Sequence, residues 1–278
     1  MSIVTDEFAE LPTVILFVVI ASVWLLIALA IIWLGQRFVS SHVRWVSVNG
    51  VRNVLAVVAS FYGFLIGFVV VQEWNNVSDA QEDVSQLAAH LATASFAAGT
   101  LPPPTAEKLI NGLLTFGRSE VCDELPSLAT ATKQNDQTTD ALEALYKQTA
   151  DIRPTSVTAL PGFGAFFGSL GNASIARREI VNASTERVPF VMMIAIVLAG
   201  LVLLVAVGLQ DVRHGRAHVL AVVAVALFVA LGQTVVVSLS RPFAGAATVS
   251  DEPLRAGVPP EFSSCDRPAT LTDLRQLR

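Results

Sequence analysis

Four stretches of the chain are as long and as apolar as membrane-spanning helices. They cover residues 13–34, 54–71, 188–209 and 217–239, and none contains Asp, Glu, Lys or Arg. About 20 apolar residues cross roughly 30 Å of hydrocarbon as a helix, and no alternation typical of barrel strands runs through these stretches. With 15% charged residues the chain is also too apolar for an ordinary soluble domain. The sequence therefore predicts an all-α integral membrane protein with four transmembrane helices in two hairpins.

The segment between the second and third spans predicts an extramembrane helical bundle. No Gly or Pro occurs between Gln72 and Ala98, and Val84, Leu87 and Leu91 recur at helical spacing. The second helix is therefore expected to extend far beyond the bilayer. Further helices are predicted at 105–120, 137–151 and 168–187, with a polar loop at 126–137 and a glycine-rich turn at 161–168.

These patterns divide the chain into five parts. Residues 1–53 hold an N-terminal segment, the first transmembrane helix and a basic loop, and residues 54–72 are the second transmembrane helix. Residues 73–187 form the extramembrane helical domain, residues 188–240 the second transmembrane hairpin, and residues 241–278 an extramembrane tail. The first span is expected to be a permanent anchor, because acidic residues and no Lys or Arg precede it.

The charges flanking the spans predict the orientation. Short loops rich in Lys and Arg lie on the cytoplasmic side of membrane proteins. The arginines of the two short loops here are Arg37, Arg44, Arg52, Arg213 and Arg216. From residue 53 to residue 107 there is no Lys or Arg. The composition is typical of a bacterial chain, so we expect a multi-pass protein of the bacterial cytoplasmic (inner) membrane whose helical domain and termini lie outside the cytoplasm.

Two cysteines fall on the same side of the membrane in this topology. Cys122 belongs to the helical domain and Cys265 to the tail. On an oxidising side they are able to form a disulfide that ties the tail to the domain. The sequence leaves a second interpretation open, in which both thiols are unpaired, because it gives no distance between them.

The second span differs in composition from the other three. Gly63 and Gly67 form a small-xxx-small pair that lets another helix approach closely. Phenylalanines recur at helical spacing beside them. One interpretation is ordinary helix packing; the other is a ring of such helices around a pore with an apolar constriction. The candidate pore residues are Ser60, Phe61, Phe64, Phe68 and Gln72, with Trp74 and Asn75 at the membrane exit.

The sequence offers little chemistry beyond the membrane. It lacks a zincin His pair, a G-x-S-x-G elbow, a P-loop and a carboxylate pair within a span. His214 and His218 are four residues apart, but Gly215 lies between them and no metal site is predicted. The net charge of −5 is modest, and nothing indicates nucleic-acid binding. We therefore expect no enzyme activity, no cofactor and no metal, and a protein whose partners are the lipid bilayer and further copies of itself.

Two stretches resemble the bestrophin-like family, a group defined by a domain of unknown function. The first runs from Phe64 through Val71 to Trp74 and a long polar helix. The second runs from Leu239 to Gly245. Family members share the order of hairpin, soluble helices, hairpin and tail. The tail-motif residues are Arg241, Pro242, Phe243 and Gly245, while Ser240 stands where the family usually has Asp.

A more distant similarity is to the bestrophins, which are pentameric anion channels. Gly63-Phe64 and Trp74-Asn75 have the spacing of their pore-lining helix, so the resemblance implies that Phe64 is a neck residue and that Ser60 replaces a second one. It implies a homo-oligomer, pentameric by analogy, that passively conducts small anions. Bestrophins keep their soluble helices in the cytoplasm, opposite to the orientation predicted from charge. The alternative function is a non-conducting membrane scaffold or envelope-sensing protein that acts through its helical domain.

Overall fold

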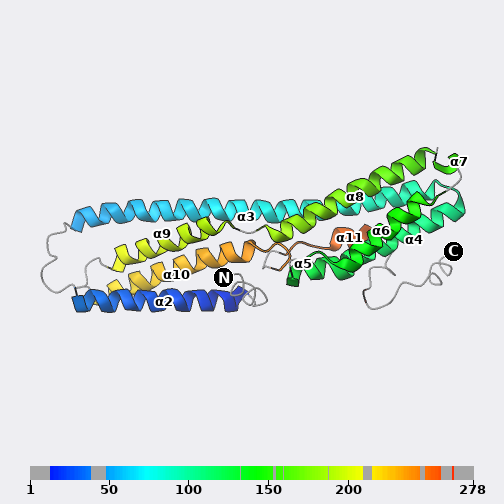
Figure 1. Ribbon diagram of the computed structural model, residues 1–278. Helices are drawn as coiled ribbons and strands as arrows, with labels where there is room; N and C mark the ends of the chain where they lie inside the picture. The colour runs from blue at the N-terminus through cyan, green and yellow to red at the C-terminus, as the bar shows by residue number, and fades with distance from the viewer. Residues whose placement is uncertain are drawn as a thin grey trace. The chain divides into compact units, whose positions relative to one another are not determined.

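The computed structural model describes residues 13–38, 48–131, 133–152, 155–158, 160–186, 188–208, 215–244, 248–257 and 265, and regular structure within them is helical throughout. The helices are α2 (Thr13–Phe38), α3 (Val48–Gly99), α4 (Pro103–Ser119), the π-helix η1 (Glu120–Glu124), α5 (Leu125–Ala131), α6 (Asp136–Ala150), α7 (Thr155–Thr158), α8 (Pro161–Thr185), α9 (Phe190–Gly208), α10 (Gly215–Leu239) and α11 (Glu252–Gly257). Figure 1 shows them along the chain.

Four helices are long and apolar enough to cross a membrane, namely α2, α3, α9 and α10. The prediction of an all-α protein with four membrane helices is therefore confirmed. The second of them, α3, is one uninterrupted helix of 52 residues, as Figure 1 shows, whereas about 20 residues suffice to span a bilayer.

The chain separates into two compact units: a first unit of Met1–Asn75 and Arg187–Arg241, and a second of Asn76–Glu186 and Pro242–Arg278.

The core of the first unit is built where α2, α9 and α10 pack closely together. Trp24 of α2 is 4% exposed, and its indole N–H donates to the Oε1 atom of Gln233 on α10 over 2.8 Å. Gly200 of α9 lies at the same crossing, where a Cβ would approach Val229 to 2.8 Å. Small residues let membrane helices approach closely, and glycine is what this crossing requires.

The core of the second unit uses the apolar faces predicted from helical spacing. Val84, Leu87 and Leu91 of α3 are all buried. They belong to one cluster with Phe116 of α4 and Phe166 of α8. Helix α6 begins after Asn135, whose side-chain oxygen accepts hydrogen bonds from the backbone N–H groups of residues 137 and 138. This N-cap satisfies donors that the helix itself leaves free.

Two local predictions are wrong. The expected loop at 126–137 contains most of α5, which continues from η1 without a break, because Leu128 is buried in the core. The expected turn at 161–168 is the start of α8, with Phe166 fully buried. Gly162 is needed there for close approach, since a Cβ would collide with the side-chain oxygen of Thr100.

Candidate functional site

One face of α3 is exposed along the segment that the sequence singles out. Phe61, Phe64 and Phe68 are 60%, 74% and 53% exposed. At 3.6 residues per turn they form one stripe with Gln72, which is also exposed. We call these four residues the phenylalanine stripe. Ser60 is exposed one turn before Phe64, and Trp74 and Asn75 are exposed at the end of the segment.

The opposite face of α3 is buried within the first unit. Tyr62 and Val69 are each 1% exposed and belong to the core formed with α2, α9 and α10. The hydroxyl of Tyr62 donates to the backbone carbonyl of Val229 on α10 over 3.4 Å. Glu73, the first acidic residue after the second span, is 4% exposed. These contacts determine which way α3 faces and leave the phenylalanine stripe outward.

The two glycines of the second span are also on the exposed side. Both Gly63 and Gly67 have open space around them, with no heavy atom within 4 Å of where a Cβ would lie. Gly200, by contrast, is tightly enclosed at its helix crossing. The small-xxx-small pair is therefore not used for packing among the described residues of this chain.

The other membrane helices expose surfaces of a different kind. The exposed large side chains of α2 are predominantly aliphatic, and those of α9 and α10 are mostly so. Examples are Val18, Leu26, Leu29, Val197, Leu198, Leu220 and Leu231. Branched aliphatic side chains match lipid tails. The α3 face differs because it combines aromatic rings, glycine and polar residues.

The tail motif is only partly within the described residues. Pro242 and Phe243 are buried, and Phe243 packs into the core of the second unit. Arg241 is half-buried, and Gly245 lies outside the described residues. Further along, the backbone N–H of Ser250 donates to the side-chain oxygen of Gln81 over 2.6 Å, and the amide of Gln81 donates back over 3.3 Å. These contacts attach the tail to the second unit, and α11 follows them.

The two cysteines are joined. Cys122 of η1 and Cys265 form a disulfide with their Cα atoms 5.5 Å apart. The two cysteines are 143 residues apart in the sequence, and they are the two cysteines of the chain.

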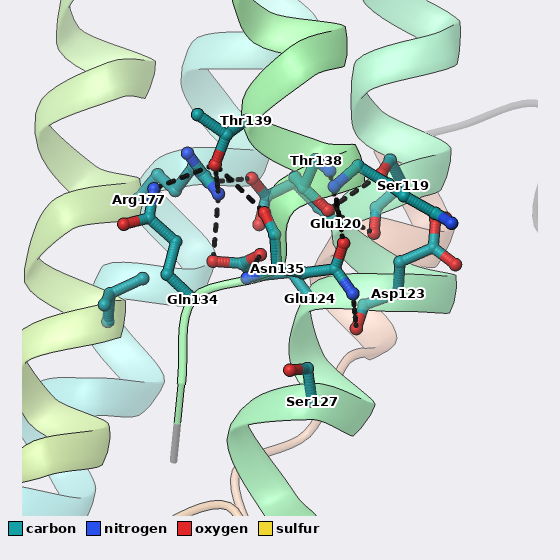
Figure 2. A network of polar contacts seen from close by, with 12 residues as sticks. Ser119, Glu120, Asp123, Glu124, Ser127, Gln134, Asn135, Thr138, Thr139 and Arg177 are labelled. Carbon is teal, nitrogen blue, oxygen red and sulfur yellow. Dashed lines mark hydrogen bonds and ion pairs between the residues drawn. The ribbon is translucent and has the colours of Figure 1, made fainter. Parts of the chain in front are cut away.

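A buried ion cluster that no sequence motif indicates joins η1, which also carries Cys122, to α8 (Figure 2). The cluster consists of Glu120 and Glu124 of η1 with Arg177 of α8. The Nε atom of Arg177 is 2.8 Å from Oε1 of Glu120, and its Nη2 atom is 3.0 Å from Oε1 of Glu124. The side chains of both glutamates are fully buried and that of Arg177 is 5% exposed. A sequence signal exists, because Arg177 lies on the stripe of α8 that also holds Ala173 and Ile180.

Hydroxyl and amide groups surround the cluster (Figure 2). The backbone N–H of Asn135 donates to Oε2 of Glu124 over 2.8 Å, and Arg177 donates to the hydroxyl of Thr139 over 3.1 Å. Ser119 and Thr138 bond to each other over 2.7 Å at the start of η1. By contrast, neither carboxyl oxygen of Glu120 accepts a well-directed hydrogen bond from the described residues.

Metal binding finds no support in the described part of the chain, where no group of three or more His, Cys, Asp or Glu side chains is arranged to hold an ion. His218 is described and lies at the start of α10, whereas His214 falls outside the described residues. The described residues offer two other features: an exposed aromatic face on α3 and a buried ion cluster in the second unit.

Comparison of the sequence with known families identifies the family of this chain. The family model of the bestrophin-like domain matches residues 22–254. The chain belongs to the bestrophin-like family. No curated protein sequence matches this bestrophin-like chain significantly.

Solved structures share the fold of the bestrophin-like chain at low sequence identity. A bacterial bestrophin homologue from Klebsiella pneumoniae, solved by zinc phasing, has a TM-score of 0.65 at 12% identity, covering 86% of this chain and 97% of that one. A single-substitution variant of the Klebsiella homologue gives 0.62 at 11% identity, with coverages of 88% and 98%. A structure described as a membrane protein with one substitution gives 0.64 at 10% identity, with coverages of 87% and 98%. The likeness establishes a common fold.

Proposed function

We propose that the chain forms a homo-oligomeric pore in the bacterial inner membrane, in which copies of α3 surround a passive path for small anions. The observation that carries the proposal is the exposure of Phe64 and its stripe on a helix whose other face is buried in its own unit. An exposed helix face in a membrane contacts either lipid or another protein. Pentameric assembly follows by analogy with the bestrophins.

The composition of the α3 face favours contact with other copies. The glycines Gly63 and Gly67 offer a close-approach surface that the described chain leaves open. They and the phenylalanine stripe occupy neighbouring sectors of the same exposed face, because 3.6 residues make one turn. In a ring of helices, the glycine sector packs against the next copy while the phenylalanine stripe faces the axis.

The path so formed suits passive conduction of anions. Residues 54–72 carry no charge, so neither a proton relay nor a voltage sensor lies along it. Rings of phenylalanine form an apolar constriction that gates by dewetting, and their edges carry the positive end of the aromatic quadrupole. Ser60, one turn before Phe64, provides a polar side chain that binds water on one side of the constriction, and Gln72 provides one on the other side.

Reconstitution into liposomes tests this function. We expect anion flux with the wild-type chain and a several-fold higher flux with Phe64→Ala, because the smaller side chain removes the dewetting barrier. Phe228→Ala is the matched control, since Phe228 is 59% exposed on α10 and is not in the proposed path; its flux should equal that of the wild type.

A wild type and a Phe64→Ala variant that are equally silent would overturn the pore. If the purified particle then contained one or two copies, the non-conducting scaffold would be the better function, because a path lined by one helix per subunit needs several copies.

We further propose that the second unit and both termini lie outside the cytoplasm. The arginine-rich short loops support this orientation, and so does the disulfide, since such bonds persist in oxidising compartments. After reduction of sealed spheroplasts, a membrane-impermeant thiol reagent should modify Cys122 and Cys265. A cysteine introduced as Ser40→Cys in a chain lacking both native cysteines should react only after lysis. The reverse pattern would place the second unit in the cytoplasm.

A further inference from the structure

The buried ion cluster of the second unit contains two carboxyl groups and one guanidinium. If all three groups are ionised, Glu120, Glu124 and Arg177 carry one uncompensated negative charge. Both glutamate side chains have no exposed surface, so water does not stabilise that charge. An unpaired buried charge is strongly unfavourable, and a carboxyl in this position takes up a cation or becomes neutral.

The hydrogen bonds distinguish the two carboxyl groups. Glu124 accepts one bond from Arg177 and a second from the backbone N–H of Asn135, and bonds of this kind stabilise a carboxylate. Glu120 has the Nε atom of Arg177 near one oxygen, but neither oxygen accepts a well-directed bond from the described residues. Arg177 thus pairs with both carboxyl groups, but Glu124 has the additional bond from the backbone and Glu120 does not, so Glu120 is the group left to be neutralised.

We propose that Glu120 is a proton-binding site, and that the bound proton holds η1 in its packing against Arg177 of α8. The ligand is a proton and not a metal ion, because no third carboxylate or other metal-binding side chain completes a coordination shell among the described residues. The site lies in a π-helix, a rare element that frequently marks functional positions. The proposal does not depend on whether the chain conducts.

The charged groups that act on Glu120 are few. Arg177 faces it from α8 and Glu124 from η1 itself. Asp123, also on η1, bonds to Ser119; α5 has no titratable residue, and Thr138 of α6 and Ser119 of α4 are neutral. Burial raises the pKa of Glu120 from 4.5 to about 8, with Arg177 lowering it and Glu124 raising it.

The sign of the pH dependence follows from this shift. Between the unfolded pKa of 4.5 and the folded pKa of about 8, the folded chain binds more protons than the unfolded chain. Stability from this site is therefore highest at low pH within that range and is lost as the pH rises through about 8. Burial and three neighbouring carboxylates raise the pKa of Asp83 to about 6, so the range from pH 7 to pH 9 lies above the pKa of Asp83 and spans that of Glu120.

Infrared difference spectroscopy of the full chain in lipid tests the proposal directly. A protonated carboxyl has a C=O stretching band that a carboxylate lacks. We expect one such band at pH 7 that disappears towards pH 9 with a midpoint near pH 8. It should be absent from Glu120→Gln and unchanged in Glu143→Gln, whose residue is exposed and paired with Lys147. No titrating band in the wild type, or the same band in Glu120→Gln, would refute a proton at this position.

A second variant and a second measurement cover a failure of Glu120→Gln to fold. Glu124→Gln frees Arg177 to neutralise Glu120 alone, so the midpoint of the band should move to lower pH. The thermal midpoint of the wild type should fall between pH 7 and pH 9, and that of Glu120→Gln should change less. An equal fall in both would show that the proton does not hold η1 in place.

Discussion

Replacing Arg177 by Ala should lower the free energy of unfolding of the second unit by about 3–5 kcal/mol, the cost typical of removing one partner from a buried ion pair. The substitution leaves Glu120 and Glu124 buried without the guanidinium that contacts both. The midpoint of thermal unfolding, followed by circular dichroism in detergent, should fall by roughly 10 °C.

The neighbouring residue gives the control for this experiment. Arg178→Ala removes the same side chain one position along α8, where it is exposed, and should change stability by less than about 0.5 kcal/mol. Equal losses in the two variants would contradict the assignment. A triple variant with apolar residues at positions 120, 124 and 177 should recover much of the stability, since the loss comes from unpaired charge.

Replacing Trp24 by Ala should destabilise the first unit by about 3 kcal/mol, the lower end of the range for a buried aromatic residue. In lipid the loss comes from the cavity and from missing packing contacts, because lipid is as apolar as the core. Trp24 is 4% exposed and lies beside Gly200 at the crossing of α2, α9 and α10. The thermal midpoint in detergent and the fraction of monodisperse particles measure the effect.

Two variants separate packing from hydrogen bonding. Trp33→Ala removes a tryptophan of the same helix that is 61% exposed, and it should leave the thermal midpoint nearly unchanged. Trp24→Phe keeps an aromatic ring but removes the donor to Gln233, which should cost about 0.6 kcal/mol, as is typical of hydrogen bonds between membrane helices. A Trp24→Ala variant as stable as Trp33→Ala would show that this crossing does not stabilise the unit.

The large features of the fold could be predicted from the sequence because they depend on length and periodicity. Uninterrupted apolar stretches identify membrane helices, and the spacing of Val84, Leu87 and Leu91 identifies the inner face of α3. The predictions failed at 126–137 and 161–168, where composition favoured loops. There, burial of Leu128 and Phe166 in the shared core outweighed the local preferences of proline and glycine.

The site was predictable to a different degree in each unit. The stripe from Phe61 to Gln72 follows from helical spacing, but its exposure depends on how Tyr62 and Val69 pack against other spans. The buried ion cluster joins residues 53 positions apart, Glu124 and Arg177. The sequence predicts a helix at Arg177 but none at Glu124, which follows the predicted helix 105–120, and it gives no reason to pair the two residues.

The bond between Cys122 and Cys265 turns the chain into a covalent ring that encloses α9 and α10. That ring is closed only after both of these helices have been synthesised, so oxidation must follow the last membrane crossing. Once it is closed, a single protease cut anywhere between the two half-cystines leaves the pieces joined, and they separate on a gel only after a reducing agent is added.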